Sequence, residues 1–435
     1  MTRILVHIEQ PTARARYALD HLLRGILGLH VEYIARPLVA GSQDAPLLFY
    51  GRAPVPGAFH IAPAGLLERT GLETIDPAVG AVDGMPVLFP TTDGDLPFDP
   101  FAGAFYLLTR HEELTGVDLD MHGRPVTATL HGAKHGYLDR PVVDEWAMHL
   151  GKALQRFDPR IEIAQRTYRQ VATIDLDNGF KYLGREVWRS VGAASRDLFR
   201  ADWSGIRDRI AVLAGQRKDP FDVYAELERL IAPYADRVVF FVLTSARGPM
   251  DHAIPITHPR YRSRLNDLGR WAEVGIHPSY DSSVNTDLIG KQYTTHRSVV
   301  PSTGRLSRQH FLRLRLPDTY RALIAAGITE DHTMGLHDRI GFRAGTCTPY
   351  PWFDIPQETV TPLMVHPFAV MDNTLRNKLH WTPGEAVEHT TALIQRIRTV
   401  QGTFTGLWHE SFLSDSGEFR GWAGAVERII RTAAA

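Results

Sequence analysis

The sequence is poor in cysteine, has no long apolar segment and carries almost no excess charge. Cys347 is the one cysteine among 435 residues, so no disulfide can form within the chain. No run of 18 or more apolar residues occurs, so no membrane-spanning helix is predicted. The first residues also lack the apolar stretch of a secretory signal, and together these absences predict a cytoplasmic protein.

Basic and acidic side chains nearly balance in number. The chain has 48 Lys plus Arg and 49 Asp plus Glu, a formal charge of -1. Nucleic-acid-binding proteins usually carry a basic excess, so this balance argues against a nucleic-acid partner. The hydrophobic share of 44% and the charged share of 22% are typical of soluble globular proteins, and the length predicts two domains. The oligomeric state is left open by these features.

The apolar pattern changes near residue 165. Residues 1–165 alternate short β-like runs with helical patterns, which predicts a small α/β domain of unknown role. Residues 166–435 repeat β-then-α units, which predicts a (β/α) barrel or a close variant with a helical insertion at about 180–235. The strands expected in the two parts are 4–8, 31–34, 46–51, 170–175, 238–243, 273–276, 361–365 and 402–408. The main helices expected are 19–29, 101–114, 142–154, 264–271, 317–326 and 383–400.

Ionisable residues gather where these apolar runs end. They are Asp175 and Asp177, His277, Arg343 and His409. Two carboxylates on one strand repel each other unless a cation lies between them, and imidazole is a common ligand of divalent metals. The ordered set indicates metal-assisted hydrolysis. Each member alone also has a structural explanation: Asp177-Asn178-Gly179 is a good turn, and a lone histidine or arginine often makes a structural hydrogen bond or ion pair.

These motifs resemble those of the polysaccharide deacetylases with a NodB-homology domain (carbohydrate esterase family 4). The segment from Thr173 to Gly179 is similar to the family's Thr-Phe-Asp-Asp-Gly motif, which implies Asp175 as the base and Asp177 as a metal ligand. His277 matches the first position of the His-Ser/Thr-x-x-His motif, and Arg343 is similar to the arginine that holds the base. Leu407-Trp408-His409 matches Leu-x-His, which implies His409 as the acid, with Asp372 as the carboxylate that tunes it.

The resemblance covers about residues 170–435, and the arrangement is most similar to the divergent branch with an extra N-terminal domain. It implies a distorted (β/α) barrel that binds one divalent metal, often Zn²⁺, and no other cofactor. The second histidine of the His-Ser/Thr-x-x-His motif is missing. We expect His310 as the third metal ligand, because a second imidazole preserves an Asp-His-His set, and Asp281, four residues after His277, is the alternative.

The resemblance therefore implies a metal-dependent hydrolase that removes an acetyl group from a carbohydrate or another acylated sugar. Two other hypotheses stay open. One is hydrolysis of a small non-peptide C–N bond by the same barrel. The other is a degenerate barrel that binds glycan or acts as a scaffold, which bound metal would distinguish from an enzyme.

Overall fold

The computed structural model describes residues 3–36, 45–185, 203–245, 248–300 and 303–434. Contacts within the chain divide it into two compact units that are not consecutive in sequence. Unit 1 comprises Met1–Arg169, Thr329–Ala369 and Ala392–Phe404, and unit 2 comprises Gln170–Ile328, Val370–Thr391 and Thr405–Ala435. Both units mix helices with largely parallel sheets, so the predicted α/β class is confirmed.

Unit 1 begins with a four-stranded parallel sheet in the order β2-β1-β3-β4. Its strands are β1 Arg3–Ile8, β2 His30–Tyr33, β3 Leu47–Tyr50 and β4 Phe59–Ile61. All four residues of β3 and the last five of β1 are buried, as expected for strands covered on both faces. The three strands expected in this region are confirmed to within one residue at each end.

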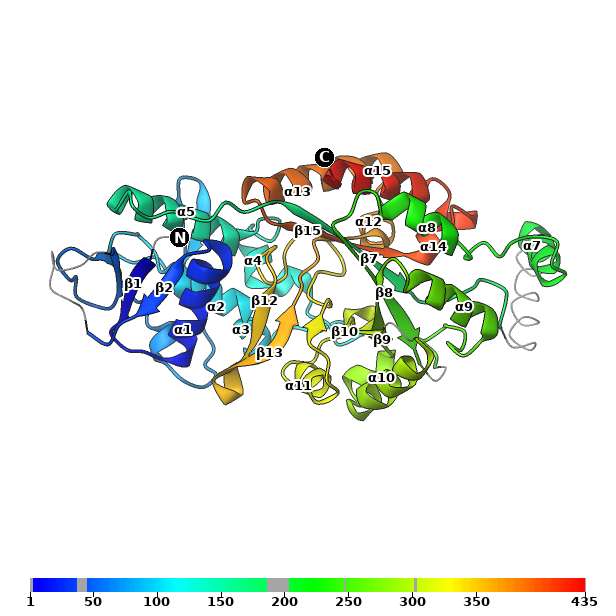
Figure 1. Ribbon diagram of the computed structural model, residues 1–435, viewed down its shortest axis with the longest axis horizontal. Helices are drawn as coiled ribbons and strands as arrows, with labels where there is room; N and C mark the ends of the chain where they lie inside the picture. Colours follow the sequence, from blue (N-terminus) through cyan, green and yellow to red (C-terminus); the bar gives the residue numbers. More distant parts are fainter. Residues whose placement is uncertain (1–2, 37–44, 186–202, 246–247, 301–302, 435) are drawn as a thin grey trace. The chain divides into compact units, whose positions relative to one another are not determined.

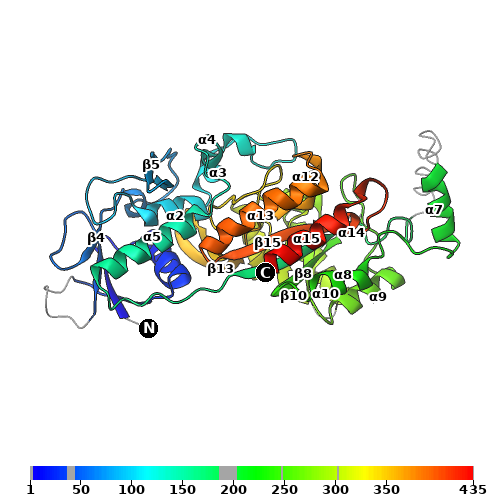
Figure 2. The same ribbon diagram turned by 90° about the horizontal axis from the view of Figure 1, so that it is seen from above.

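Helices cover this sheet, with α2 beside α5 in Figure 2. The predicted helix 19–29 begins earlier, because Thr12 caps α1 by accepting a hydrogen bond from Ala15 N, and it continues into a π-helical turn, η1. The predicted helix 101–114 is two helices, since Arg110 adopts a left-handed conformation (φ 53°) between them. The helices are α1 Ala13–Asp20, η1 His21–Ile26, α2 Pro100–Leu108, α3 His111–Thr115, α4 His131–Lys134 and α5 Val142–Phe157.

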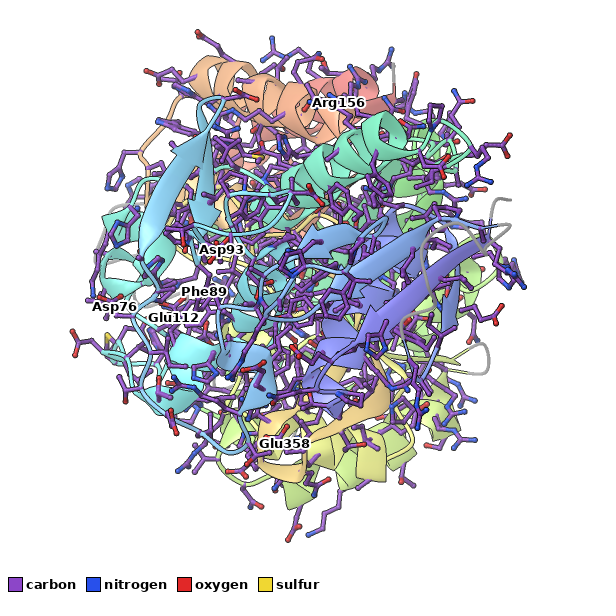
Figure 3. All side chains as sticks on the ribbon, turned by 90° about the vertical axis from the view of Figure 1, so that its left-hand side faces the viewer. Asp76, Phe89, Asp93, Glu112, Arg156 and Glu358 are labelled. Atoms are coloured by element: carbon purple, nitrogen blue, oxygen red, sulfur yellow. The ribbon has the colours of Figure 1, made fainter. Side chains whose placement is uncertain are left out.

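The remaining strands of unit 1 are short. A hairpin joins β5 Val79–Val82 to β6 Met85–Leu88, and three later strands pair in the order β12-β13-β11. These are β11 Glu330–Asp331, β12 Tyr350–Asp354 and β13 Thr359–Val365. Glu358, labelled in Figure 3, precedes β13 and anchors the buried Arg14 of α1 through a hydrogen bond of 2.9 Å from Nε to Oε2.

Unit 2 holds strands in the order β10-β9-β8-β7-β15-β14. β7, β8, β9 and β10 pair in parallel along this order, as do β14 and β15, and Figure 1 shows β7 to β10 side by side. They are β7 Arg169–Leu176, β8 Arg237–Thr244, β9 Glu273–Pro278, β10 Thr303–Ser307, β14 Val370–Met371 and β15 Thr403–His409. In β8 the last seven residues are buried, which is typical of a parallel strand covered on both faces.

Helices α9 and α10 pack against β9, and α15 packs against α8 and α14 (Figure 2). The described residues of the predicted insertion at 180–235 hold α7 and α8, while residues 186–202 lie outside the described part of the chain. None of the helices in the described residues is long and apolar enough to cross a membrane. The helices are α7 Trp203–Leu213, α8 Tyr224–Ile231, α9 Pro259–Leu268, α10 Asp287–Val299, α11 Asp318–Ala325, α12 Asp372–Asn377, α13 Pro383–Thr399, α14 Glu410–Leu413 and α15 Trp422–Ala434.

Candidate active site

Polar side chains gather at the carboxyl ends of the strands of unit 2. Asp175 lies in β7 and Asp177 directly after it, His277 lies in β9, and His409 ends β15. His310 follows β10 in a short 3₁₀ turn, His310–Leu312. Because the carboxyl ends of neighbouring parallel strands meet at one edge of a sheet, these residues share a site.

Two imidazole nitrogens approach one carboxylate oxygen. Asp177 Oδ1 lies 3.3 Å from His277 Nε2 and 3.8 Å from His310 Nε2. This oxygen is buried and accepts no hydrogen bond of ordinary geometry. A buried carboxylate oxygen without such a partner is costly unless a cation satisfies it.

The far nitrogen of each imidazole is held by an acceptor. His277 Nδ1 donates to the backbone oxygen of Arg308, and His310 Nδ1 donates to Asp251 Oδ1 at 2.8 Å. A proton on Nδ1 leaves the Nε2 lone pair free, and both Nε2 atoms face Asp177. Such outer acceptors are typical of metal-ligating histidines.

Asp177, His277 and His310 fit a divalent metal. Ligands about 2.0–2.1 Å from a tetrahedral ion lie about 3.3 Å apart, close to the separations found here. The set matches the residues expected from the sequence. Asp281 is exposed, lies in the turn Tyr280–Ser283, and is not part of this group of donor atoms.

Charge in the metal-free site is distributed between Asp177 and His310. Burial raises the pKa of Asp177, but the combined effect of His310, His277 and His409 is larger and opposite. The pKa of Asp177 therefore lies well below its usual range. Burial lowers the pKa of His310, but Asp177 and Asp251 raise it to about 9. A proton on His310 therefore occupies the position that a cation requires.

Asp175 is held by Arg308. Arg308 Nη1 donates to Asp175 Oδ1 at 2.8 Å, and Nη2 donates to Thr173 Oγ1 at 2.8 Å. The other oxygen, Asp175 Oδ2, lies 3.7 Å from His277 Nε2. One oxygen is thus fixed and the other faces the donor atoms.

The expectation that Arg343 holds Asp175 is wrong, because Arg343 pairs with another carboxylate. Arg343 lies in unit 1, where Nε and Nη2 donate to the two oxygens of Glu113 at 2.9 and 2.7 Å. Burial raises the pKa of Glu113, but the combined effect of Arg343 and Arg110 is larger and lowers it to about 2. Arg308 reaches Asp175 because it follows β10 directly, two residues before His310, whereas Arg343 lies in a loop of unit 1.

His409 and Asp372 form the pair that the resemblance implied. His409 Nδ1 donates to Asp372 Oδ1 at 2.7 Å, and His409 N donates to Asp372 Oδ2 at 2.7 Å. His409 Nε2 lies 3.7 Å from Asp177 Oδ2. Burial lowers the pKa of His409, but Asp372 and Asp177 raise it to about 10, so the imidazole is protonated at neutral pH.

Three residues of the site were missed in the sequence: Arg308, Asp251 and Glu410. Glu410 is buried and accepts hydrogen bonds from Asp177 N at 3.2 Å and Asn178 N at 2.7 Å. Burial and the neighbouring Asp177 raise its pKa to about 7. The spacing Arg308-Gln309-His310 and the acid directly after His409 were available signals, while Asp251 lies in a loop without a motif.

Comparisons with known proteins give limited similarity. Residues 4–159 match the model of a family of unknown function, DUF7033, which covers less than half of the chain. No curated protein matches the chain.

Two solved structures are similar in part. A crystal structure from Mycobacterium smegmatis, described as a candidate polysaccharide deacetylase, has a TM-score of 0.40 and 16% identity over 63% of this chain and 87% of that chain. A GH138 enzyme that targets pectin rhamnogalacturonan II has a TM-score of 0.26 and 11% identity. That match covers 99% of this chain, which spans about half of the other. At these TM-scores neither similarity defines the activity of this chain.

Proposed function

We propose that unit 2 is a metal-dependent hydrolase that removes an acetyl group from a carbohydrate. The observation that carries this proposal is the convergence of Asp177 Oδ1, His277 Nε2 and His310 Nε2, with Asp175 Oδ2 3.7 Å from His277 Nε2 and His409 Nε2 3.7 Å from Asp177 Oδ2. A hydrolase needs a site for an activated water, a base and an acid, and these residues can supply all three.

Asp177, His277 and His310 would hold the metal. When bound, a divalent ion supplies Lewis acidity: it activates water and polarises the acyl oxygen. Zn²⁺ suits one carboxylate and two imidazoles, as do other borderline ions.

The remaining residues move protons. Asp175 Oδ2 accepts the proton of the attacking water, while Arg308 keeps Oδ1 fixed. His409 holds a proton at Nε2 and delivers it to the departing amine or alcohol, and Asp372 stabilises the charged imidazole from Nδ1. Glu410 holds the backbone at Asp177 and Asn178 and so positions the ligand carboxylate.

The sugar substrate and the barrel assignment rest on the sequence motifs. We infer that β7 to β10, β14 and β15 belong to a distorted (β/α) barrel of the NodB type, and that the protein acts in the cytoplasm. The segment Thr173–Gly179 and the triplet Leu407-Trp408-His409 support the choice of an acetylated sugar.

Acetate release from N-acetylated and O-acetylated oligosaccharides tests the proposal. The full chain, stripped with a chelator and reloaded with Zn²⁺, should regain activity, and Asp175→Asn should lose it while keeping its metal. Full turnover by metal-loaded Asp175→Asn would refute the role of the base. A protein that binds no metal at this site would instead favour the glycan-binding scaffold.

A further inference from the structure

Among the residues that the structure describes, three groups of histidines and carboxylates bring their donor atoms within 4.8 Å of one another. One is the candidate active site in unit 2. The other two lie in unit 1: Asp76 with His131 and His135, and Glu330 with His332 and His366. The surroundings of the imidazole nitrogens decide which of these two groups can bind a metal ion.

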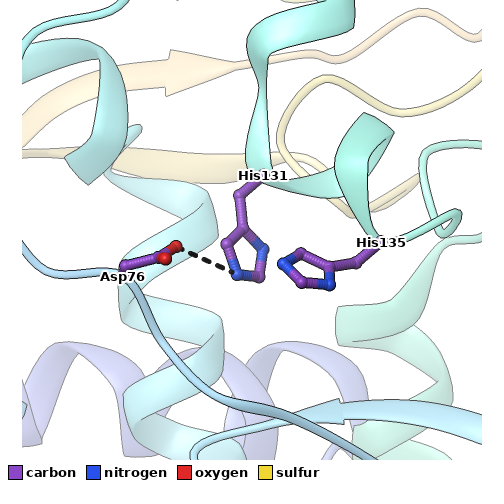
Figure 4. Close-up of side chains that lie close together, drawn as sticks. All are labelled: Asp76, His131 and His135. Atoms are coloured by element: carbon purple, nitrogen blue, oxygen red, sulfur yellow. Dashed lines mark ion pairs between the residues drawn. The ribbon is translucent and has the colours of Figure 1, made fainter.

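In the Asp76 group, drawn in Figure 4, both ring nitrogens of His131 are occupied by hydrogen bonds. His131 Nε2 lies 3.0 Å from the backbone oxygen of Pro77 and donates to it, so Nδ1 accepts from the hydroxyl of Tyr137. Asp76 Oδ1 is 3.7 Å from His131, and its side chain is 91% exposed. His131 is therefore a hydrogen-bonded core histidine, and this group is not a metal site.

The Glu330 group is built by strand pairing. Asp331 of β11 pairs with Val365 of the parallel strand β13, so the next residues along both strands, His332 and His366, are neighbours. Their rings stack with centroids 4.4 Å apart and an angle of 9° between the planes. Alternate residues of a strand point to the same side, so Glu330 lies on the same face as His332.

Both Nε2 atoms approach the same carboxylate oxygen. Glu330 Oε2 lies 2.9 Å from His366 Nε2 and 3.7 Å from His332 Nε2. The buried Nε2 of His366 makes no hydrogen bond of ordinary geometry, although the carboxylate oxygen is so close. The two separations bracket the value of about 3.3 Å between ligands of a tetrahedral ion.

We propose that Glu330, His332 and His366 form a second site for a borderline divalent cation such as Zn²⁺. Two imidazoles and one carboxylate are ligands that such ions accept. The side chains of Glu330 and His366 are 28% and 16% exposed, which lets water complete the coordination. The ion links the end of β11, a strand of two residues, to the end of β13, and so stabilises unit 1.

Counting bound Zn²⁺ tests this site independently of the proposed function. After loading with Zn²⁺ and dialysis, atomic absorption should find two equivalents in the full chain, one in His366→Gln and one in His277→Gln. His135→Gln, a matched change in the Asp76 group, should retain two. Two equivalents in His366→Gln, or one in the unaltered chain that only His277→Gln removes, would overturn the second site.

Thermal unfolding gives a second measurement in case the variant folds poorly. Zn²⁺ should raise the Tm of His277→Gln, whose second site is intact, and Glu330→Gln in that background should abolish the rise. An unchanged rise would also overturn the proposal. His366→Gln could lose Zn²⁺ while His277→Gln retains all of it. That result would support the second site and contradict a metal in the proposed active site.

Discussion

Arg308 donates from Nη1 to Asp175 Oδ1 at 2.8 Å, and both side chains are buried. This pair sets the direction of Asp175, because the second oxygen remains 3.7 Å from His277 Nε2. The base and the metal ligands are thus held from different strand ends, β7, β9 and β10, within one unit.

Replacing Arg308 should impair catalysis and stability together. Arg308→Met leaves Asp175 buried without its ion-pair partner, a change that typically costs about 3–5 kcal/mol of unfolding free energy. Loss of a positioned base should lower turnover about 10²–10⁴-fold. Urea unfolding and acetate release measure the two effects, and Arg308→Lys should recover part of both.

Arg343→Met is the matched control for that change. Its guanidinium pairs with Glu113, which keeps Arg110 as a second partner, so the loss of unfolding free energy should be smaller than in Arg308→Met, and metal-loaded folded protein should keep kcat within a few-fold. Wild-type turnover in Arg308→Met together with lost turnover in Arg343→Met would restore the assignment made from the sequence.

Asp251 should control metal affinity through His310. In Asp251→Ala the Nδ1 of His310 loses its carboxylate acceptor, and such outer-shell changes typically cost about 10–100-fold in affinity. Competition with a chromogenic chelator measures the dissociation constant. Asp281→Ala should leave it unchanged; an equal loss there would make Asp281 a ligand.

Metal binding should weaken as the pH falls. His310, with a pKa of about 9, is protonated in the metal-free protein below that pH, and its proton must leave when the cation binds. The apparent association constant should therefore drop about tenfold per pH unit between about pH 9 and 6, for one displaced proton. Asp177 adds no further dependence, because its pKa lies well below this range. The same constant at pH 6 and pH 8 would contradict this description.

His409 should act as the acid and not as a ligand. His409→Gln should keep its metal but release acetate from an acetamide about 10²–10⁴-fold more slowly. An aryl acetate, whose leaving group needs no proton, should be affected far less. Burial lowers the pKa of His409, but Asp372 raises it by more, so the rate on the acetamide should stay level through neutral pH and decline only at alkaline pH. Equal losses on both substrates would argue for a structural role.

The sequence predicted most strands of the sheets and several candidate site residues, for a physical reason. Buried parallel strands such as β8 are continuous apolar runs, and polar residues directly after them mark the edge where function is found. Asp177, His277 and His409 were accessible in this way, whereas His310 was expected only because a second imidazole completes the Asp-His-His set that the resemblance implies.

Other features depend on contacts that no local pattern reveals. The break at Arg110 needs a left-handed residue inside a helical pattern, and the anchors Asp251 and Arg308 act across 59 and 133 positions of sequence. Arg343 was misassigned for the same reason, because its partner Glu113 is 230 positions away.

An anomalous-scattering map of crystals loaded with Zn²⁺ tests the central claim most directly. We expect an anomalous peak that marks an ion coordinated by Asp177 Oδ1, His277 Nε2 and His310 Nε2. A map from Zn²⁺-loaded crystals without a peak at these three atoms, or with the ion held in unit 2 by Asp281 in place of His310, would contradict it.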